Sequence, residues 1–212
     1  MTGAWPWLPY VGPFAVFATL TYIMPIWPVG AGTAYLFKTL VTGAMLALFW
    51  PVLRREMQWT FDGPAVAAGI GVFLMWVALE GRYPQIGHSS FDPYMVAGQT
   101  NVNVVIGIRL FGAAMVVPLM EEVFWRSFVM RFLVASRFKS VPLGQFTWYS
   151  FVITAIAFGF EHHRWLPGIL AGIVYAALLY RTRNLFSPIL AHAITNLLLG
   201  IYVVYTGQWT YW

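Results

Sequence analysis

Long apolar stretches recur along almost the whole chain, and short polar segments separate them. A helix needs roughly 20 apolar residues to cross a hydrocarbon core of about 30 Å. Seven stretches can be interpreted as spans: 10–27, 34–53, 64–80, 102–119, 146–162, 167–181 and 188–205. The fourth is expected to continue as a helix to about residue 136. The pattern predicts an all-α, polytopic membrane protein.

Prolines and one long polar connection interrupt this pattern. Pro9, Pro13 and Pro25 predict kinks or breaks in the first span, which membrane helices tolerate when neighbouring groups satisfy the freed backbone. The longest connection, residues 81–101, contains one Tyr-Pro and one Asp-Pro turn signal. No polar segment is long enough to fold separately, so we expect a single integral membrane domain over residues 1–212.

The composition agrees with this interpretation. The chain has 212 residues, of which 60% are hydrophobic and 9% charged, whereas soluble domains have about 25% charged residues. Cysteine is absent from the sequence, which excludes disulfides, thiolate metal sites and a cysteine nucleophile. No basic segment or small-residue cleavage site precedes the first span, so we expect that span to be retained and the mature protein to begin near Met1.

The net charge of +5 is explained by membrane topology, because the basic residues lie in clusters beside apolar stretches. The clusters at 54–55, 126–139 and 181–183 are predicted to face the cytoplasm. The N-terminus would then be cytoplasmic and the C-terminus outside, in a multi-pass protein of the cell's inner (plasma) membrane. Nucleic acid is not an expected partner.

Ionisable or strongly polar side chains nevertheless occur in four places inside or beside the predicted spans. They are Glu121, Glu122 and Arg126; the segment 161–164; His192 and Asn196; and the isolated Lys38 and Arg109. A charge at the bilayer centre costs about 2.5 to 3.5 kcal/mol, so each is expected to be paired, directed into a cavity or functional. Snorkelling or local pairing is the preferred explanation for four residues: Lys38, His88, Arg109 and Arg164. The three clusters contain catalytic residue types, and a functional role is the preferred explanation for them. The alternative is that Glu122 and Arg126 form a buried structural pair and the histidines make interhelical hydrogen bonds worth about 0.6 kcal/mol each.

Helical spacing separates the two adjacent glutamates. Successive residues of a helix point about 100° apart, so Glu121 and Glu122 face different directions. Glu122 and Arg126 are four residues apart and share a face, so we expect them to pair. Two further pairs have this spacing: His192 with Asn196, and Phe158 with His162. Glu121 is therefore the carboxylate expected to remain free.

Depth in the membrane gives a conflicting indication. Counted from the predicted interfaces, Glu121 and His162 each lie about 16 residues, roughly 24 Å, inside the protein, so they can meet. His192 lies only about five residues, roughly 8 Å, beyond Ser187. Three explanations remain open: the turn 181–188 enters the protein interior, the helices tilt strongly, or the predicted topology is wrong.

Three short motifs in these clusters resemble those of a known family. EEVFWR at 121–126 resembles EExxxR, FGFEH at 158–162 resembles FxxxH, and HAITN at 192–196 resembles HxxxN. Their order and approximate separation are similar to those of the CAAX prenyl protease family, which comprises the Ras-converting CAAX endopeptidases and bacterial relatives and is also called CPBP or Abi. The resemblance covers about residues 120–200, and the first hundred residues match only as membrane spans.

The resemblance implies a glutamate-dependent intramembrane endopeptidase that cuts near the end of a lipidated or membrane-associated protein. It implies about seven to eight transmembrane helices, a conical polar cavity between core helices, a catalytic core over 102–205 and no cofactor or catalytic metal. By motif position, Glu121 and His162 would activate water, and His192 and Asn196 would hold the oxyanion. The supporting residues would be Glu122, Arg126 and Phe158. His162 is preferred to His163 because it alone completes the motif.

Two alternatives from the residues themselves remain. Glu121, His162 and His192 could instead be the ligands of a catalytic zinc ion, although HExxH is absent from the sequence. The polar cavity could also bind a lipid or a partner helix in a protein that hydrolyses nothing. A transporter has less support, because no internal repeat is present in the sequence. Neither the substrate nor the oligomeric state can be inferred from the sequence.

Overall fold

The computed structural model describes the chain except for residues 1–4, 24–25, 27–29, 88–89 and 98–100. The described residues form helices and connections without a β-strand. The α-helices are α1 (Leu8–Ile23), α2 (Ala31–Leu53), α3 (Gly63–Ala78), α4 (Pro93–Val96), α5 (Val102–Phe111), α6 (Val117–Glu122), α7 (Met130–Phe132), α8 (Trp148–Phe160), α9 (Trp165–Thr182) and α10 (Phe186–Thr206). Short 3₁₀ turns are η2 (Arg54–Glu56), η5 (Phe138–Ser140) and η6 (Trp209–Tyr211).

The prediction of an all-α polytopic membrane protein is confirmed. Within the described part of the chain, four helices are long and apolar enough to cross a membrane, and three shorter apolar helices accompany them. These seven correspond to the seven predicted stretches, with ends that differ by a few residues. The predicted end of the first span and the kink at Pro25 lie outside the described residues, as do Met1 and His88.

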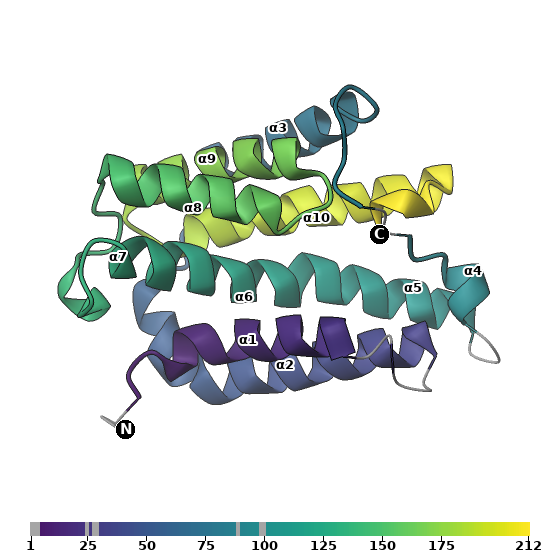
Figure 1. The fold of residues 1–212 in the computed structure, drawn as a ribbon, viewed down its shortest axis with the longest axis horizontal. Coiled ribbons are helices and arrows are strands. Elements are labelled where there is room, and N and C mark those ends of the chain that lie inside the picture. The colour runs from purple at the N-terminus through teal and green to yellow at the C-terminus, as the bar shows by residue number, and fades with distance from the viewer. Residues whose placement is uncertain (1–4, 24–25, 27–29, 88–89, 98–100) are drawn as a thin grey trace.

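The helices are arranged around one long central helix (Figure 1). α1 and α2 pack together on one side of it, and α3, α8, α9 and α10 lie on the other side. The central helix is continuous over residues 102–132 and consists of α5, α6 and α7 joined by two π-helical segments, η3 (Gly112–Val116) and η4 (Val123–Val129). The pair Glu121 and Glu122 therefore lies on a short α-helical segment between two wider ones.

Proline explains why a backbone carbonyl becomes available in the first π-helical segment. The backbone N–H of Val117 donates to the carbonyl of Gly112, five residues earlier. In that register the next carbonyl, of Ala113, would accept from residue 118, which is a proline and has no N–H. The oxygen of Ala113 is consequently left for another donor. π-helical segments are frequent at functional sites, and this one faces α10.

Part of the turn before α10 is buried in the protein. Asn184 and Leu185 are buried. The Asn184 side chain accepts from the backbone N–H of Gln58 at 2.8 Å and donates to its carbonyl at 2.8 Å. The N–H of Leu185 donates to the carbonyl of Glu56 at 3.0 Å. α10 thus begins among buried residues, which agrees with the first of the three explanations, and His192 contacts Glu122.

Close contact between α3 and α10 fixes the helix that carries His192. A Cβ atom built on Gly69 would lie 2.5 Å from the carbonyl oxygen of Ala191 and 2.9 Å from the Cβ of Ile194. Only glycine permits this approach, and small residues are the usual means by which membrane helices pack closely. Thr195 strengthens the contact, because its Oγ1 lies 2.9 Å from the carbonyl oxygen of Gly69.

Candidate active site

Glu122 is the centre of a buried polar cluster. Its Oε1 accepts from Nδ1 of His192 at 2.9 Å, and its Oε2 lies 3.1 Å from Nε of Arg126. All three side chains are buried, and Glu122 is fully so. The predicted pairing of Glu122 with Arg126 is present, and His192 is an additional partner from another helix. Because Nδ1 of His192 donates to Glu122, the other ring nitrogen, Nε2, faces away from this carboxylate.

Arg126 connects the central helix with α8 and α9. Its Nη2 donates to the carbonyl of Gly172 in α9 at 3.3 Å. The guanidinium lies over the ring of Phe158, 4.2 Å from its centroid, and 5.8 Å from the centroid of Tyr175. Phe158 is fully buried as well. The two supporting residues Arg126 and Phe158 therefore form one stack that holds the Glu122 carboxylate in place.

Glu121 has a different environment from its neighbour. It is buried, yet its Oε2 has no hydrogen-bond partner among the described residues. The nearest charged partner is His192, whose Nε2 lies 4.0 Å from this oxygen. That separation is too long for a direct hydrogen bond. The free carboxylate expected from helical spacing is thus present, next to the free nitrogen of His192.

His162 follows the end of α8 and is the imidazole of the doublet that lines the cavity. Its Nδ1 donates to the carbonyl of Phe158 at 2.8 Å, which leaves Nε2 as a possible acceptor. Its ring packs edge-on against Trp76, with centroids 5.6 Å apart. The adjacent His163 points elsewhere, and its Nδ1 lies 2.7 Å from the carbonyl oxygen of Ile86. The choice of His162 over His163 agrees with this geometry.

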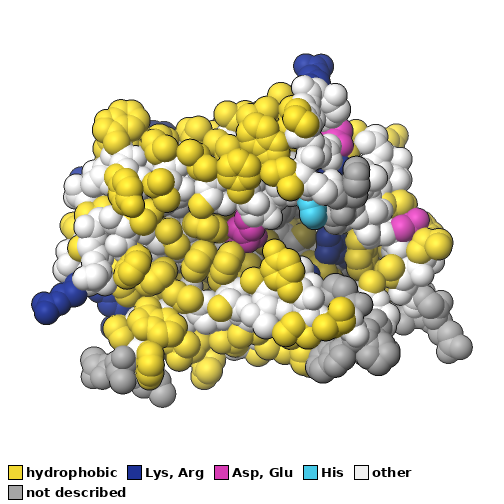
Figure 2. All heavy atoms as spheres, in the orientation of Figure 1, with side chains coloured by type: hydrophobic (Ala, Val, Ile, Leu, Met, Phe, Trp, Pro, Cys, Tyr) yellow, Lys and Arg dark blue, Asp and Glu magenta, His cyan; other side chains and the backbone are white. Residues whose placement is uncertain are grey.

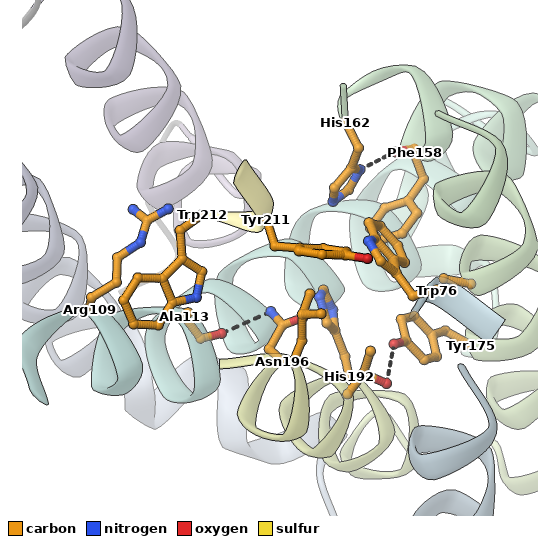
Figure 3. A pocket seen from close by; sticks show the side chains of 13 residues that line it. Trp76, Arg109, Ala113, Phe158, His162, Tyr175, His192, Asn196, Tyr211 and Trp212 are labelled. Atoms are coloured by element: carbon orange, nitrogen blue, oxygen red, sulfur yellow. Dashed lines mark hydrogen bonds between the residues drawn. The ribbon is translucent and has the colours of Figure 1, made fainter. Parts of the chain in front are cut away.

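Asn196 is held by the carbonyl that the proline leaves without a helical partner. Its Nδ2 donates to the Ala113 oxygen at 2.9 Å (Figure 3). A primary amide has two N–H donors, so one is used here and the second remains for a ligand. Asn196 and His192 lie one turn apart on α10 and line the same cavity.

The cavity has a volume of about 150 Å³. Its lining residues are Trp76, Arg109, Ala113, Phe158, His162, Ala171, Tyr175, His192, Thr195, Asn196, Leu199, Tyr211 and Trp212. In Figure 3, His162 projects into it from one side and His192 with Asn196 from the other. Glu121, Glu122 and Arg126 are absent from this described lining, and the two glutamates lie next to the His192 ring. A space-filling view shows acidic, histidine and basic side chains along a hollow that hydrophobic side chains surround (Figure 2).

Several lining residues carry no signal in the sequence. Tyr175 stacks on the His192 ring at 5.0 Å between centroids and donates from its hydroxyl to Oγ1 of Thr195 at 2.8 Å. Trp76 and Tyr211 come from segments without a motif. Their presence depends on which helices are neighbours, and no spacing within one helix indicates that.

Lys38 and Arg109, both expected to pair locally, have different surroundings. Lys38 is paired locally, with Nζ donating to Oγ1 of Thr21 at 3.0 Å. Arg109 lines the cavity, and its guanidinium lies over Tyr35 and Phe91 at 4.3 and 4.8 Å from the ring centroids. The local contacts expected for Arg109 are therefore aromatic faces, and they hold it at the edge of the site.

Two features bear on the remaining carboxylate and on metal binding. Glu161 is exposed, and its Oε2 accepts from Nε1 of Trp125 at 2.8 Å. The described residues contain no group of three His, Asp or Glu side chains that could hold a metal ion. The arrangement therefore gives no support to Glu121, His162 and His192 as a zinc ligand set.

The fold and the site define a polytopic membrane protein with a buried carboxylate and imidazole cluster beside a narrow cavity. Residues 103–198 match the model of the family described as type II CAAX prenyl endopeptidase Rce1-like. This part of the chain is similar to a family of peptide hydrolases, and the predicted resemblance to CAAX endopeptidases is confirmed. No curated protein and no solved structure gives a significant match to the chain.

Proposed function

We propose that the chain is a glutamate-dependent intramembrane endopeptidase. The observation that carries this proposal is the position of Glu121, a buried carboxylate whose Oε2 has no hydrogen-bond partner among the described residues and lies 4.0 Å from Nε2 of His192. A water molecule beside this oxygen would have Glu121 as its acceptor, next to the imidazole that we propose as an oxyanion donor. Glu122 fixes the other side of the imidazole, as an orienting group does in many catalytic sites.

Peptide hydrolysis follows from these positions in two steps. Glu121 removes a proton from a water molecule, with Nε2 of His162 as a second acceptor. At the same time the water oxygen attacks the peptide carbonyl carbon. The carbonyl oxygen becomes an oxyanion. Asn196 donates to it through its second N–H, and His192 donates through Nε2 when both ring nitrogens carry protons. The C–N bond then breaks, and the proton taken from water passes to the leaving amine.

The proposed substrate is a membrane-anchored or lipidated protein cut near one end. The family match supports prenylated, membrane-associated substrates as a class. A cavity of about 150 Å³ supports entry of a narrow extended chain in preference to a folded domain. We propose no nucleic-acid partner and no metal.

Comparison of membrane-protein termini in cells that express the wild type or Glu121→Gln tests this function. The expected result is a new terminus that appears with the wild type and is lost with the variant at equal abundance. Purified protein should cleave the corresponding peptide in the presence of a chelator. An unchanged set of termini, or cleavage that requires added zinc, would contradict the proposal.

We also propose that the protein lies in the plasma membrane with a cytoplasmic N-terminus. Because the chain has no cysteine, single cysteines can be introduced without background. A membrane-impermeant maleimide should label Gln208→Cys in intact cells and Arg55→Cys only after the membrane is opened. The reverse pattern would show the opposite orientation.

A further inference from the structure

A short segment after α10 closes one end of the cavity. We call residues 208–212 the C-terminal turn. It contains the 3₁₀ turn η6, and its residues Tyr211 and Trp212 line the cavity. In Figure 3 the ring of Tyr211 projects from this turn into the space between His162 and Asn196. The side chain is therefore in a position to limit what fits beside the candidate catalytic groups.

Arg164 holds the C-terminal turn in this position. Its Nε and Nη2 each donate to Glu80, at 2.7 Å in both cases, while Nη1 donates to the carbonyl of Thr210 at 2.9 Å. The guanidinium also lies over the Tyr211 ring, 4.3 Å from its centroid. Arg164 is buried, and these hydrogen bonds hold the pKa of Glu80 below its ordinary value. A bidentate ion pair is a geometrically specific anchor.

A second contact fixes the start of the same turn. The backbone N–H of Phe91 donates to the carbonyl of Trp209 at 3.4 Å, and the rings of Tyr94 and Trp209 pack edge to face with centroids 5.9 Å apart. Burial raises the pKa of Tyr211 to about 12, so its hydroxyl is neutral at physiological pH. The Tyr211 ring is thus an uncharged part of the cavity wall, and Arg164 and the segment with Phe91 and Tyr94 hold the turn that carries it.

The size of the cavity sets a limit on the substrate. A cavity of about 150 Å³ is large enough for one benzene molecule. The phenyl ring of phenylalanine and smaller side chains are within this limit, whereas the indole of tryptophan exceeds it. Enlarging the cavity without disturbing the catalytic side chains would require removal of a wall residue.

Part of the cavity wall comes from outside the region that matches the family. Every candidate catalytic residue lies within the family match at 103–198, but Trp76, Leu199, Tyr211 and Trp212 lie outside it. A wall residue outside the matched region can set a substrate preference specific to this protein, because it can change without altering the reaction itself.

We infer that Tyr211 is a specificity-determining residue, positioned by Arg164, that restricts the substrate side chain next to the cleaved bond to about the size of phenylalanine or smaller. The inference rests on the proposed endopeptidase function. It assigns substrate preference to one side chain of the C-terminal turn and gives Arg164 a positioning role.

Cleavage of a peptide series that varies this one position through Ala, Val, Leu, Phe and Trp tests the inference. Wild type should prefer the first four to Trp. Tyr211→Ala should raise the ratio of kcat/KM for Trp over Ala by about tenfold or more, the range that changes in an apolar pocket produce. Tyr211→Phe keeps the ring and should keep the preference. Tyr205→Ala is the matched control, because Tyr205 is 90% exposed near the end of α10.

Arg164 is tested through the same ratio. Arg164→Gln loses the ion pair and should broaden the preference with Tyr211 still present, and Arg164→Lys should restore part of it. A purely structural role would lower protein stability and leave the ratio unchanged. The same ratio in Tyr211→Ala as in wild type would overturn the inference alone. A folded wild type that cleaves no member of the series, nor the peptide found from cellular termini, would overturn the proposed function itself and the inference with it.

Discussion

Glu121 and Glu122 are adjacent, yet substitution by glutamine should have different effects at the two positions. Glu122→Gln should mainly lower stability, whereas Glu121→Gln should mainly lower activity. Glu122 is fully buried and serves both His192 and Arg126. Its neutralisation leaves the buried guanidinium of Arg126 with the Gly172 carbonyl and aromatic faces as partners. Removing one partner of a buried pair costs 3 to 5 kcal/mol. Because glutamine retains the shape and one acceptor, we expect about 3 kcal/mol, roughly a 150-fold change in the unfolding equilibrium at about 1.4 kcal/mol per tenfold.

Glu121→Gln should be nearly neutral for folding, because the structure gives its Oε2 no hydrogen bond to lose among the described residues. We expect a change below about 1 kcal/mol. Activity should fall by roughly 10² to 10⁴, the usual contribution of general acid–base catalysis. Reversible unfolding in mixed micelles, followed by tryptophan fluorescence, measures both variants. The double variant Glu122→Leu with Arg126→Met is the control and should recover most of the lost stability. Equal destabilisation by the two glutamine variants would refute the division of roles.

Three further predictions follow from the helical packing and from the partly buried ion pair of Arg164 with Glu80. Pro118→Ala supplies a backbone N–H that competes with Asn196 for the carbonyl of Ala113. Loss of one hydrogen bond worth about 1 kcal/mol should lower kcat about fivefold, and an unchanged kcat would contradict this. Gly69→Ala should destabilise by about 1 to 3 kcal/mol in the same unfolding assay, whereas Gly71→Ala, with open space around it, should be neutral or stabilising. Because the pKa of Glu80 is lowered in the folded protein, its stabilising effect should be present at pH 5 to 7 and lost as pH falls below about 4.5. The difference in melting temperature between wild type and Glu80→Gln should shrink in that acidic range, and a constant difference would argue against the ion pair.

Helical periodicity explains why much of the site could be predicted. The i, i+4 spacing placed Glu122 with Arg126, and Phe158 with His162, because a helix fixes the angle between its own residues. Apolar length likewise predicted the seven helices. The catalytic roles of the motif residues, and the division of the chain into N-terminal spans and catalytic core, remain predictions.

Features that depend on contacts between distant segments could not be predicted. The turn before α10 looks polar and superficial in sequence, but the backbone of residues 56–58 satisfies Asn184 and Leu185 and lets the turn be buried. The π-helical register around Pro118 required the observed hydrogen bonds. Tyr211 reaches the cavity because contacts with Arg164 and with the segment at residues 91–94 hold the C-terminal turn there.

The central claim is that Glu121 acts as the base in peptide hydrolysis. The most direct test is a single-turnover assay of purified wild type and Glu121→Gln, with chelator present, on the peptide identified from cellular termini. The account predicts rapid cleavage by the wild type and a rate lower by about 10² to 10⁴ for a folded variant that still binds the peptide. Cleavage by folded Glu121→Gln at the wild-type rate would contradict it.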